Sequence, residues 1–471
     1  MTTARTRRRL ARAAAVLLAT AVAGAATPAA EARPPKGDTA RVSEGAKGEQ
    51  FDGNSNALGL SEDGRSALFG SDAPGVLPDG TMGQAEVYVR DLRNGHLERV
   101  SVADDGSRLN AATTEAAISG DGRYVAFSTT ATDVVPGQPT HAGDVFVRDR
   151  RTGRTELVST GDGVSGAGDD QSIRSAGSPS LSRDGRYVAY ASDRTDLASG
   201  VKRGKRNVFV TDRWTHTTRL VTVGADGTGA DNHSFGPTIS ADGGTVGFTS
   251  RAGNLLPSTE PEPDPATDAP ATEPDPGTDA PRLTGPRFYP YYVWRADTGL
   301  ITGASLEPGA AHDLRGAGSD GRISPDGRFA VYSLPVHGGG RPPRGIRMDV
   351  YVHELATGAV TKVNTDLPGT STTYSSSGGV MTGDGRWVYF ASDAPTLVAD
   401  DTNDTTDVFR RDLWTGRIER VSLTRDGGQS TAGSYRPSVD ATGGTVLFDA
   451  EDGNLVPGDD NAATDVFRRR L

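Results

Sequence analysis

The stretch from Ile118 to Phe127 reads Ile-Ser-Gly-Asp-Gly-Arg-Tyr-Val-Ala-Phe, and it decides the fold. A short apolar strand leads into an Asp-Gly turn, and a second strand rich in β-branched and aromatic residues follows. Asp-Gly suits a two-residue turn in which both residues have positive φ, since Gly adopts that conformation freely and Asp better than most residues. The stretch therefore predicts a β-hairpin with Asp121 and Gly122 at its tip.

This hairpin motif recurs along the chain. Five clear copies and one degenerate copy accompany the first, and four of the six steps between successive turn residues measure 58 residues. Self-similarity at a fixed period is the signature of a repeat architecture. The other copies are Ser61–Arg65, Ser182–Arg186, Ser240–Gly243, Ser324–Arg328, Thr382–Arg386 and Asp440–Gly444.

Each repeat carries signals for four strands, which we call A to D. In the second repeat they lie near Ala116–Ser119, Tyr124–Ser128, Asp144–Asp149 and Thr155–Ser159. Alternation in strand C places Val145 and Val147 on one face and Phe146 on the other, so both faces are apolar, as a sheet between two neighbours requires. Four-stranded antiparallel sheets in series predict an all-β fold, a β-propeller, whose radial closure leaves only short strand edges.

The two ends of the chain predict how the ring closes. The last repeat stops after strand C, at Asp465–Leu471, and has no strand D. Just beyond the amino-terminal leader, Ala40–Ser43 matches the strand D segments Arg99–Ser101 and Arg420–Ser422. We therefore expect a seven-bladed propeller, a single domain over 39–471, closed by pairing of the amino-terminal strand with the last blade.

One step between repeats is longer than the others and holds an insertion in the fourth blade. Residues 258–285 are rich in Pro, Asp, Glu and Thr. A segment with so few apolar groups to bury stays extended and solvated. We expect a disordered loop between strands B and C, either a tolerated insertion or a partner-binding arm.

Residues 1–32 have the features of an export signal peptide. Arg5, Arg7, Arg8 and Arg9 precede an apolar run from Ala13 to Ala26 that is too short to span a bilayer. The arginines suit either an ordinary Sec leader or a twin-arginine signal. The chain has no cysteine, so a secreted product would be held by its core and ring closure rather than by disulfides.

Composition limits the partners. The formal net charge is −11, which repels phosphate backbones and anionic lipid, so we expect no nucleic-acid partner. No later segment is apolar enough to cross a membrane. We expect a monomer in an extracytoplasmic compartment.

The repeat pattern Ser-x-Asp-Gly-Arg-x-Val-Ala-Phe, then Asp-Val-Phe-Val-x-Asp and a Leu-Val-Ser strand, resembles the WD40-like repeat of TolB-type propellers. The resemblance covers Thr39 to Leu471. It implies the fold but little about function, because this repeat occurs in translocation proteins, in propellers attached to peptidases and in other exported proteins. TolB itself resembles a six-bladed propeller with a preceding α/β domain, whereas seven blades are expected here.

A cation site is the best local signal for a ligand. Two loops before strand C carry the pattern Asp-x-Asn-x-x-x-Asp, whose side-chain oxygens could converge on Ca²⁺. The alternative is that they close Asx-turns with their own backbone. Ca²⁺ is the one cofactor the sequence suggests, with candidate ligands Asp401, Asn403, Asp407, Asp459, Asn461 and Asp465.

A second candidate site lies where the loops from strand D to strand A would converge, at the mouth of the central channel. These loops carry aromatic, Arg and His side chains that could bind a peptide or a glycan. The alternative is that each packs its loop against a neighbour. The candidates are His233, Phe235, Arg315, Tyr374, Tyr435 and Arg436.

The sequence has no nucleophile elbow, zinc-protease helix or Walker loop. The favoured hypothesis is therefore an exported, non-enzymatic binding or scaffold propeller with its ligand at the channel mouth. The alternative is a propeller enzyme, a polysaccharide lyase or glycoside hydrolase, with His and carboxylates converging from several blades. A third hypothesis, by analogy with TolB, is an accessory role in envelope assembly.

Overall fold

The computed structural model of the chain describes residues 38–45, 47–78, 84–139, 142–161, 175–257, 288–309, 314, 316, 320–337, 346–367, 374–451 and 453–471. The expected leader at 1–32 and the expected disordered insertion at 258–285 lie outside these residues. The insertion separates the second and third strands of the fourth sheet in the sequence.

The described residues form seven antiparallel sheets of four strands each, which confirms the predicted fold class. From the inner to the outer strand, the sheets of blades 1 to 7 are β2 (Ser55–Leu60), β3 (Ser66–Ser71), β4 (Glu86–Asp91) and β5 (Leu97–Arg99); β6 (Glu115–Ile118), β7 (Tyr124–Thr129), β8 (Asp144–Asp149) and β9 (Arg154–Leu157); β10 (Ala176–Leu181), β11 (Tyr187–Ser192), β12 (Asn207–Asp212) and β13 (Thr217–Leu220); β14 (Ser234–Ile239), β15 (Thr245–Ser250), β16 (Tyr291–Arg295) and β17 (Ile301–Gly303); β18 (Arg322–Ile323), β19 (Phe329–His337), β20 (Ile346–Glu354) and β21 (Ala359–Lys362); β22 (Ser376–Met381), β23 (Trp387–Ser392), β24 (Asp407–Asp412) and β25 (Ile418–Arg420); β26 (Ser434–Val439), β27 (Thr445–Ala450), β28 (Asp465–Arg470) and β1 (Asp38–Arg41).

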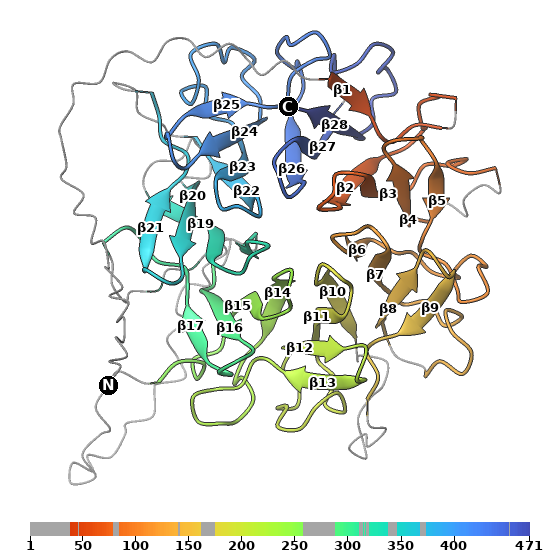
Figure 1. Cartoon of the computed structure of the whole chain (residues 1–471), viewed down its shortest axis with the longest axis vertical. Coiled ribbons are helices and arrows are strands. Elements are labelled where there is room, and N and C mark those ends of the chain that lie inside the picture. Colours follow the sequence, from red (N-terminus) through yellow and green to blue (C-terminus); the bar gives the residue numbers. More distant parts are fainter. Residues whose placement is uncertain are drawn as a thin grey trace, which may run out of the picture. The chain divides into compact units, whose positions relative to one another are not determined.

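The sheets surround a common centre, with the first strand of each blade innermost (Figure 1). The ring closes as predicted. β1 pairs with β28 in antiparallel register, from Asp38 opposite Arg470 to Arg41 opposite Phe467. One hydrogen bond beyond the strand, from the amide of Val42 to the carbonyl of Val466 at 2.6 Å, extends this ladder.

The conformation predicted for the Asp-Gly turns is wrong for the aspartate. Gly122 has φ 71°, and glycine also has positive φ at the six equivalent turns, but none of the seven preceding residues does. The loop spans four residues between Ser119 and Tyr124 instead of two. The Asp121 carboxylate accepts hydrogen bonds from the hydroxyl of Ser119 (2.7 Å) and the amide of Arg123 (3.0 Å), which hold the aspartate in ordinary backbone geometry. Only the glycine then needs the left-handed conformation.

The core repeats with the blades. In each of the seven sheets an aromatic ring on the second strand stacks on one from the third, with centroids 5.7–6.2 Å apart. Aromatic pairs of this kind contribute about 0.5–1.5 kcal/mol each beyond their burial. On the opposite face of strand C, Val145 and Val147 are also buried, as predicted.

The antiparallel order defines two ends for every sheet. The turns from strand A to B and from C to D lie at one end, which we call the turn end. The loops from B to C and from D to A lie at the other, which we call the loop end. Both predicted sites fall at the loop end.

Candidate functional site

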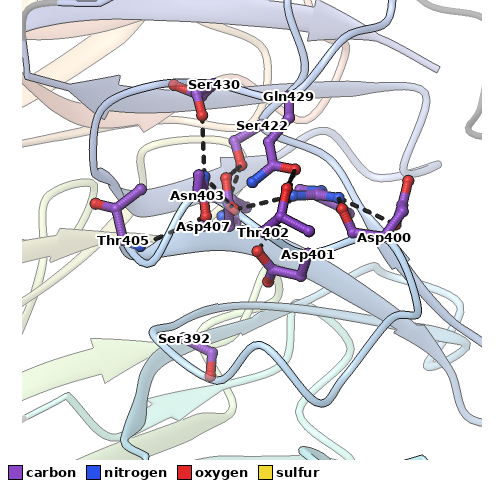
Figure 2. Close-up of polar contacts among 12 residues, drawn as sticks. Ser392, Asp400, Asp401, Thr402, Asn403, Thr405, Asp407, Ser422, Gln429 and Ser430 are labelled. Atoms are coloured by element: carbon purple, nitrogen blue, oxygen red, sulfur yellow. Dashed lines mark hydrogen bonds and ion pairs between the residues drawn. The ribbon is translucent and has the colours of Figure 1, made fainter.

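The first Asp-x-Asn-x-x-x-Asp motif gathers around an arginine. Asp407 is the fully buried first residue of β24, and the side-chain amide of Asn403 donates to its Oδ2 at 2.9 Å (Figure 2). The guanidinium of Arg420, at the end of β25, lies 3.3 Å from Asp401 Oδ1 and 3.4 Å from Asp407 Oδ2. A third carboxylate, that of Asp400, lies 3.0 Å from the same guanidinium.

Burial dominates the electrostatics of this cluster. Burial, together with the charge of Asp407, raises the pKa of Asp401 to about 6, and burial raises the pKa of Asp407 as well. The positive charge of Arg420 opposes both shifts. The guanidinium therefore occupies the position between two carboxylates that a bound cation would take.

The second motif is built in the same way at the ring closure. Arg41, from the amino-terminal strand, lies 3.0 Å from Asp459 Oδ1 and 3.3 Å from Asp465 Oδ2. The amide of Asn461 donates to the carbonyl of Phe51 at 2.6 Å, which ties this loop to the chain that enters blade 1. The three residues of the first motif are thus brought together around Arg420, and the two aspartates of the second motif around Arg41, whereas Asn461 bonds to Phe51 instead.

A cation beside the strand C carboxylate recurs in other blades. Glu86 pairs with Arg99 at 3.0 Å, and Asp349 pairs with Lys362 at 2.8 Å. The sequence carries a signal for this pairing, because the Arg-Val-Ser segments of strand D supply the arginine. Within the described ranges, no group of three or more His, Cys, Asp or Glu side chains could hold a metal ion.

Calcium binding at these motifs stays a prediction, and it requires the guanidinium to leave the carboxylates. We therefore expect millimolar CaCl₂ to raise the melting temperature more in Arg420→Met than in the unchanged protein, with the rise reversed by a chelator. Differential scanning fluorimetry with MgCl₂ as the control measures this. If CaCl₂ changes the melting temperature of neither protein, the calcium hypothesis is contradicted.

The predicted channel-mouth residues of blade 4 lie together. His233 directly precedes β14 and Phe235 lies within it, and their rings stack with centroids 6.0 Å apart. Arg251, directly after β15, places its guanidinium 5.1 Å from the Phe235 ring centre and 4.4 Å from that of Tyr289. We call His233, Phe235, Arg251 and Tyr289, together with Lys205 and Arg206, the blade 4 cluster.

The blade 4 cluster is cationic in an acidic protein. Burial lowers the pKa of His233, and the charges of Lys205, Arg251 and Arg206 lower it further, so the imidazole is neutral at pH 7. Its Nδ1 accepts a hydrogen bond from the amide of Arg206 at 3.1 Å. Among the described residues, neither Arg251 nor Lys205 has a carboxylate partner. The cluster therefore offers unpaired positive charge next to half-buried aromatic rings.

The other predicted mouth residues lie elsewhere. Tyr374 precedes β22 and packs against the core of blade 6. Tyr435 lies on β26, on the far side of the ring from β14 (Figure 1). Arg436, with φ 49°, bridges Asn56 Oδ1 at 2.7 Å and Asp449 Oδ2 at 3.0 Å. Arg315 lies outside the described residues. Sequence reasoning missed Arg251 and Tyr289, which lie at the two ends of the connection from β15 to β16 and are brought together by the pairing of those strands.

No family model matches the chain, and no curated protein matches it. Solved structures do resemble it. An oligogalacturonate lyase from Vibrio parahaemolyticus aligns over 92% of this chain and 93% of its own, at 13% identity and a TM-score of 0.50. An oligogalacturonate lyase in complex with manganese aligns over the same shares at 14% identity and a TM-score of 0.50. TolB from Acinetobacter baumannii aligns over 78% of this chain and 66% of its own, at 14% identity and a TM-score of 0.35.

At these identities the likeness establishes the propeller fold and no more. The fold implied by the TolB-type repeat pattern is confirmed, while the function is not determined by it. In the part of the chain that the structure describes, no helix is long and apolar enough to cross a membrane.

Proposed function

We propose that this chain is an exported, non-enzymatic propeller that serves as a binding or scaffold module and holds its ligand at the blade 4 cluster, at the mouth of the central channel. The observation that carries the proposal is Arg251. Its guanidinium lies against the rings of Phe235 and Tyr289, is exposed, and has no carboxylate partner among the described residues.

The cluster favours an anionic ligand. A carboxylate approaching Arg251 would also meet Lys205 and the Nε2–H of the neutral His233, because Nδ1 already accepts the amide of Arg206. Charge-assisted hydrogen bonds of this kind are about twice as strong as neutral ones. The ring of Phe235 offers an apolar face to the body of the ligand. An acidic peptide or an acidic glycan has both features.

A scaffold role in envelope assembly is the form of this proposal that the TolB-like repeat supports. In that case the ligand is a segment of another exported protein, and an acidic peptide should bind better than any sugar. A ring of short, paired strands suits this role, since it presents loops from a rigid frame.

The test is a peptide and glycan array probed with residues 34–471, with and without CaCl₂. We expect acidic members to bind and neutral ones not to bind. Arg251→Gln should weaken binding at least about tenfold, because it removes a charge-assisted hydrogen bond. Phe235→Ala should weaken it as well. Arg93→Gln removes an exposed arginine at the turn end of blade 1 and serves as the matched control. Equal binding by Arg251→Gln and Arg93→Gln would contradict the proposal.

The rival is a propeller enzyme, a lyase or a hydrolase acting on a glycan. Two of the compared structures are oligogalacturonate lyases, so polygalacturonate is the first substrate to try. A lyase needs a base, and His233 is a poor one in this geometry because its Nδ1 lone pair accepts the amide of Arg206. Appearance of an unsaturated product, followed by its ultraviolet absorbance, would replace the binding proposal with the lyase.

A further inference from the structure

The seven blades provide an internal comparison at the turn end. In every blade, the residue that follows strand C donates its amide to a carbonyl in the turn between strands A and B of the same blade. This junction residue projects toward the preceding blade. In blades 1 to 7 it is Leu92, Arg150, Arg213, Ala296, Leu355, Leu413 and Leu471. Six of the seven side chains are large, and only Ala296 is small.

Arg213 illustrates what the junction residue does between blades 2 and 3. Its guanidinium lies 4.5 Å from the ring centre of Tyr124 in blade 2. It also pairs with Glu156 of blade 2 and donates to the carbonyl of Gly185 in its own blade. Arg150 makes the corresponding pair with Glu98 between blades 1 and 2. The junction side chain therefore fills the gap between neighbouring sheets.

Between blades 3 and 4 no large side chain occupies this position, because the junction residue is Ala296. Ala296 is too short to reach across, and a cavity of about 170 Å³ opens there. Tyr187, at the position that Tyr124 has in blade 2, forms one wall, and Trp294 and the turn at Gly243 form others. Asp212, Asp242 and Arg219 contribute the charges in the lining, and Asp212 is already paired with Arg186 at 2.6 Å.

At this junction a cation stands where the neighbouring junction has an acid. Glu156 lies opposite Val147, and the equivalent residue opposite Val210 is Arg219. The side chain of Arg219 is exposed and has no ion-pair partner in the described part of the chain. Between blades 2 and 3 the junction holds the ion pair of Arg213 and Glu156. Between blades 3 and 4 the equivalent place is a cavity lined by Arg219, which is unpaired among the described residues.

We infer that the pocket between blades 3 and 4 binds a single sugar ring that carries a carboxylate, a uronic acid. The carboxylate pairs with Arg219, and the apolar face of the ring packs on Tyr187. Ring hydroxyls donate to Asp242, whose Oδ1 already accepts the Ser240 hydroxyl at 2.6 Å and the Gly244 amide at 2.9 Å, while Oδ2 has no hydrogen-bond partner among the described residues.

Size and place support this assignment. The cavity is smaller than the roughly 300–1,000 Å³ of sites for drug-sized ligands, so it suits one ring rather than a chain. It lies at the turn end, whereas the blade 4 cluster lies at the loop end of the same sheets. The inference therefore does not depend on the proposed function, and each site can be removed without the other.

The first experiment is a titration of residues 34–471 with glucuronic acid, followed by ligand-observed NMR, with glucose as the neutral control. A ligand of this size is expected to bind with a dissociation constant on the order of 1 mM. Ala296→Leu installs the side chain found at four of the other junctions and should abolish binding while leaving the melting temperature unchanged or higher. Arg251→Gln, at the other end, should bind as the unchanged protein does.

Two further variants test the charge. Arg219→Gln should raise the dissociation constant at least about tenfold. The double variant Ala296→Arg with Arg219→Glu rebuilds the pair that Arg213 makes with Glu156, and it should fold normally and bind nothing in the pocket. Equal binding of glucose and glucuronic acid, no binding of either, or full binding by Ala296→Leu would each overturn the inference.

Discussion

A chain that begins at Gly45 is expected to lose the cooperative unfolding of the propeller and to aggregate, whereas a chain that begins at Asp38 folds. The difference between the two is β1 and the three residues that follow it, Val42, Ser43 and Glu44. Without β1, the edge of β28 is left unpaired at the end of blade 7. An exposed strand edge is a template for pairing with another chain, so the shortened protein should self-associate.

The expected effect is large because β1 joins three blades. The Thr39 hydroxyl donates to the carbonyl of Leu423 in blade 6 at 2.7 Å, and Arg90 of blade 1 donates to the carbonyl of Val42 at 2.7 Å. The buried guanidinium of Arg469 donates to the Thr39 hydroxyl at 2.7 Å. Removing β1 and the residues that follow it therefore takes hydrogen-bond partners from both neighbours.

The free energy lost with this segment is comparable to the whole stability of a folded domain. Leaving the Asp459 and Asp465 carboxylates without Arg41 costs about 3–5 kcal/mol, as for other buried pairs that lose one partner. Loss of the fully buried Val42 side chain adds about 1.5–3 kcal/mol. Together these approach the roughly 5–15 kcal/mol by which whole domains are stable.

Circular dichroism melts and size-exclusion chromatography of the two chains measure this effect. A synthetic peptide covering 38–44, added in trans, should restore part of the monomeric, cooperatively melting form, because it can add itself to β28 as a strand. Identical melting curves for the chains that begin at Asp38 and Gly45 would show that closure by β1 contributes nothing.

The ring and its closure could be predicted from the sequence because they rest on local, repeated signals. Alternating apolar residues at positions such as Val145 and Phe146 define strands, and the period of the Asp-Gly turns counts the blades. The orphan strand at 40–43 needed only comparison with other copies of itself. The φ of the turn aspartate was mispredicted because a side-chain hydrogen bond to Ser119 lengthened the loop.

The sites could be predicted only in part, because they depend on residues from different strands and loops. The carboxylates of Asp401 and Asp407 were identified, but not the arginine between them, which enters from β25. Arg251 reaches Phe235 only through the pairing of β14 with β15. The cavity exists because Ala296 is small, and a missing side chain leaves no sequence motif. Only an alignment of the seven repeats shows that the other blades have a large residue at this position.

Arg420→Met is expected to destabilise the propeller by about 3–5 kcal/mol at pH 8. Methionine preserves much of the aliphatic volume, so the loss is chiefly that of a buried positive charge. Arg420 is 4% exposed and lies within 3.4 Å of two carboxylates that are themselves at most 3% exposed. Without it, Asp401 and Asp407 face each other in a site that burial already makes unfavourable for charge.

The same variant should recover stability as the pH falls. Both aspartates already have a pKa above the ordinary value in the unchanged protein, that of Asp401 about 6, and removing the cation raises them further. A carboxyl with a raised folded-state pKa binds its proton more tightly in the folded than in the unfolded chain. It therefore destabilises the fold in full above that pKa, and the penalty shrinks as the pH falls toward the lower pKa of the unfolded chain. The deficit of Arg420→Met should therefore shrink between pH 8 and pH 5.

Urea unfolding at both pH values measures this deficit, and Arg417→Met provides the matched control. Arg417 pairs with Glu419 near the same strand, but its side chain is 48% exposed, so its loss should cost less than about 1 kcal/mol and depend little on pH. A pH-independent loss in Arg420→Met would mean that packing, not charge, is what the arginine supplies. The pH dependence therefore decides whether the Asp-x-Asn-x-x-x-Asp loop is a cation site already occupied by the chain's own guanidinium.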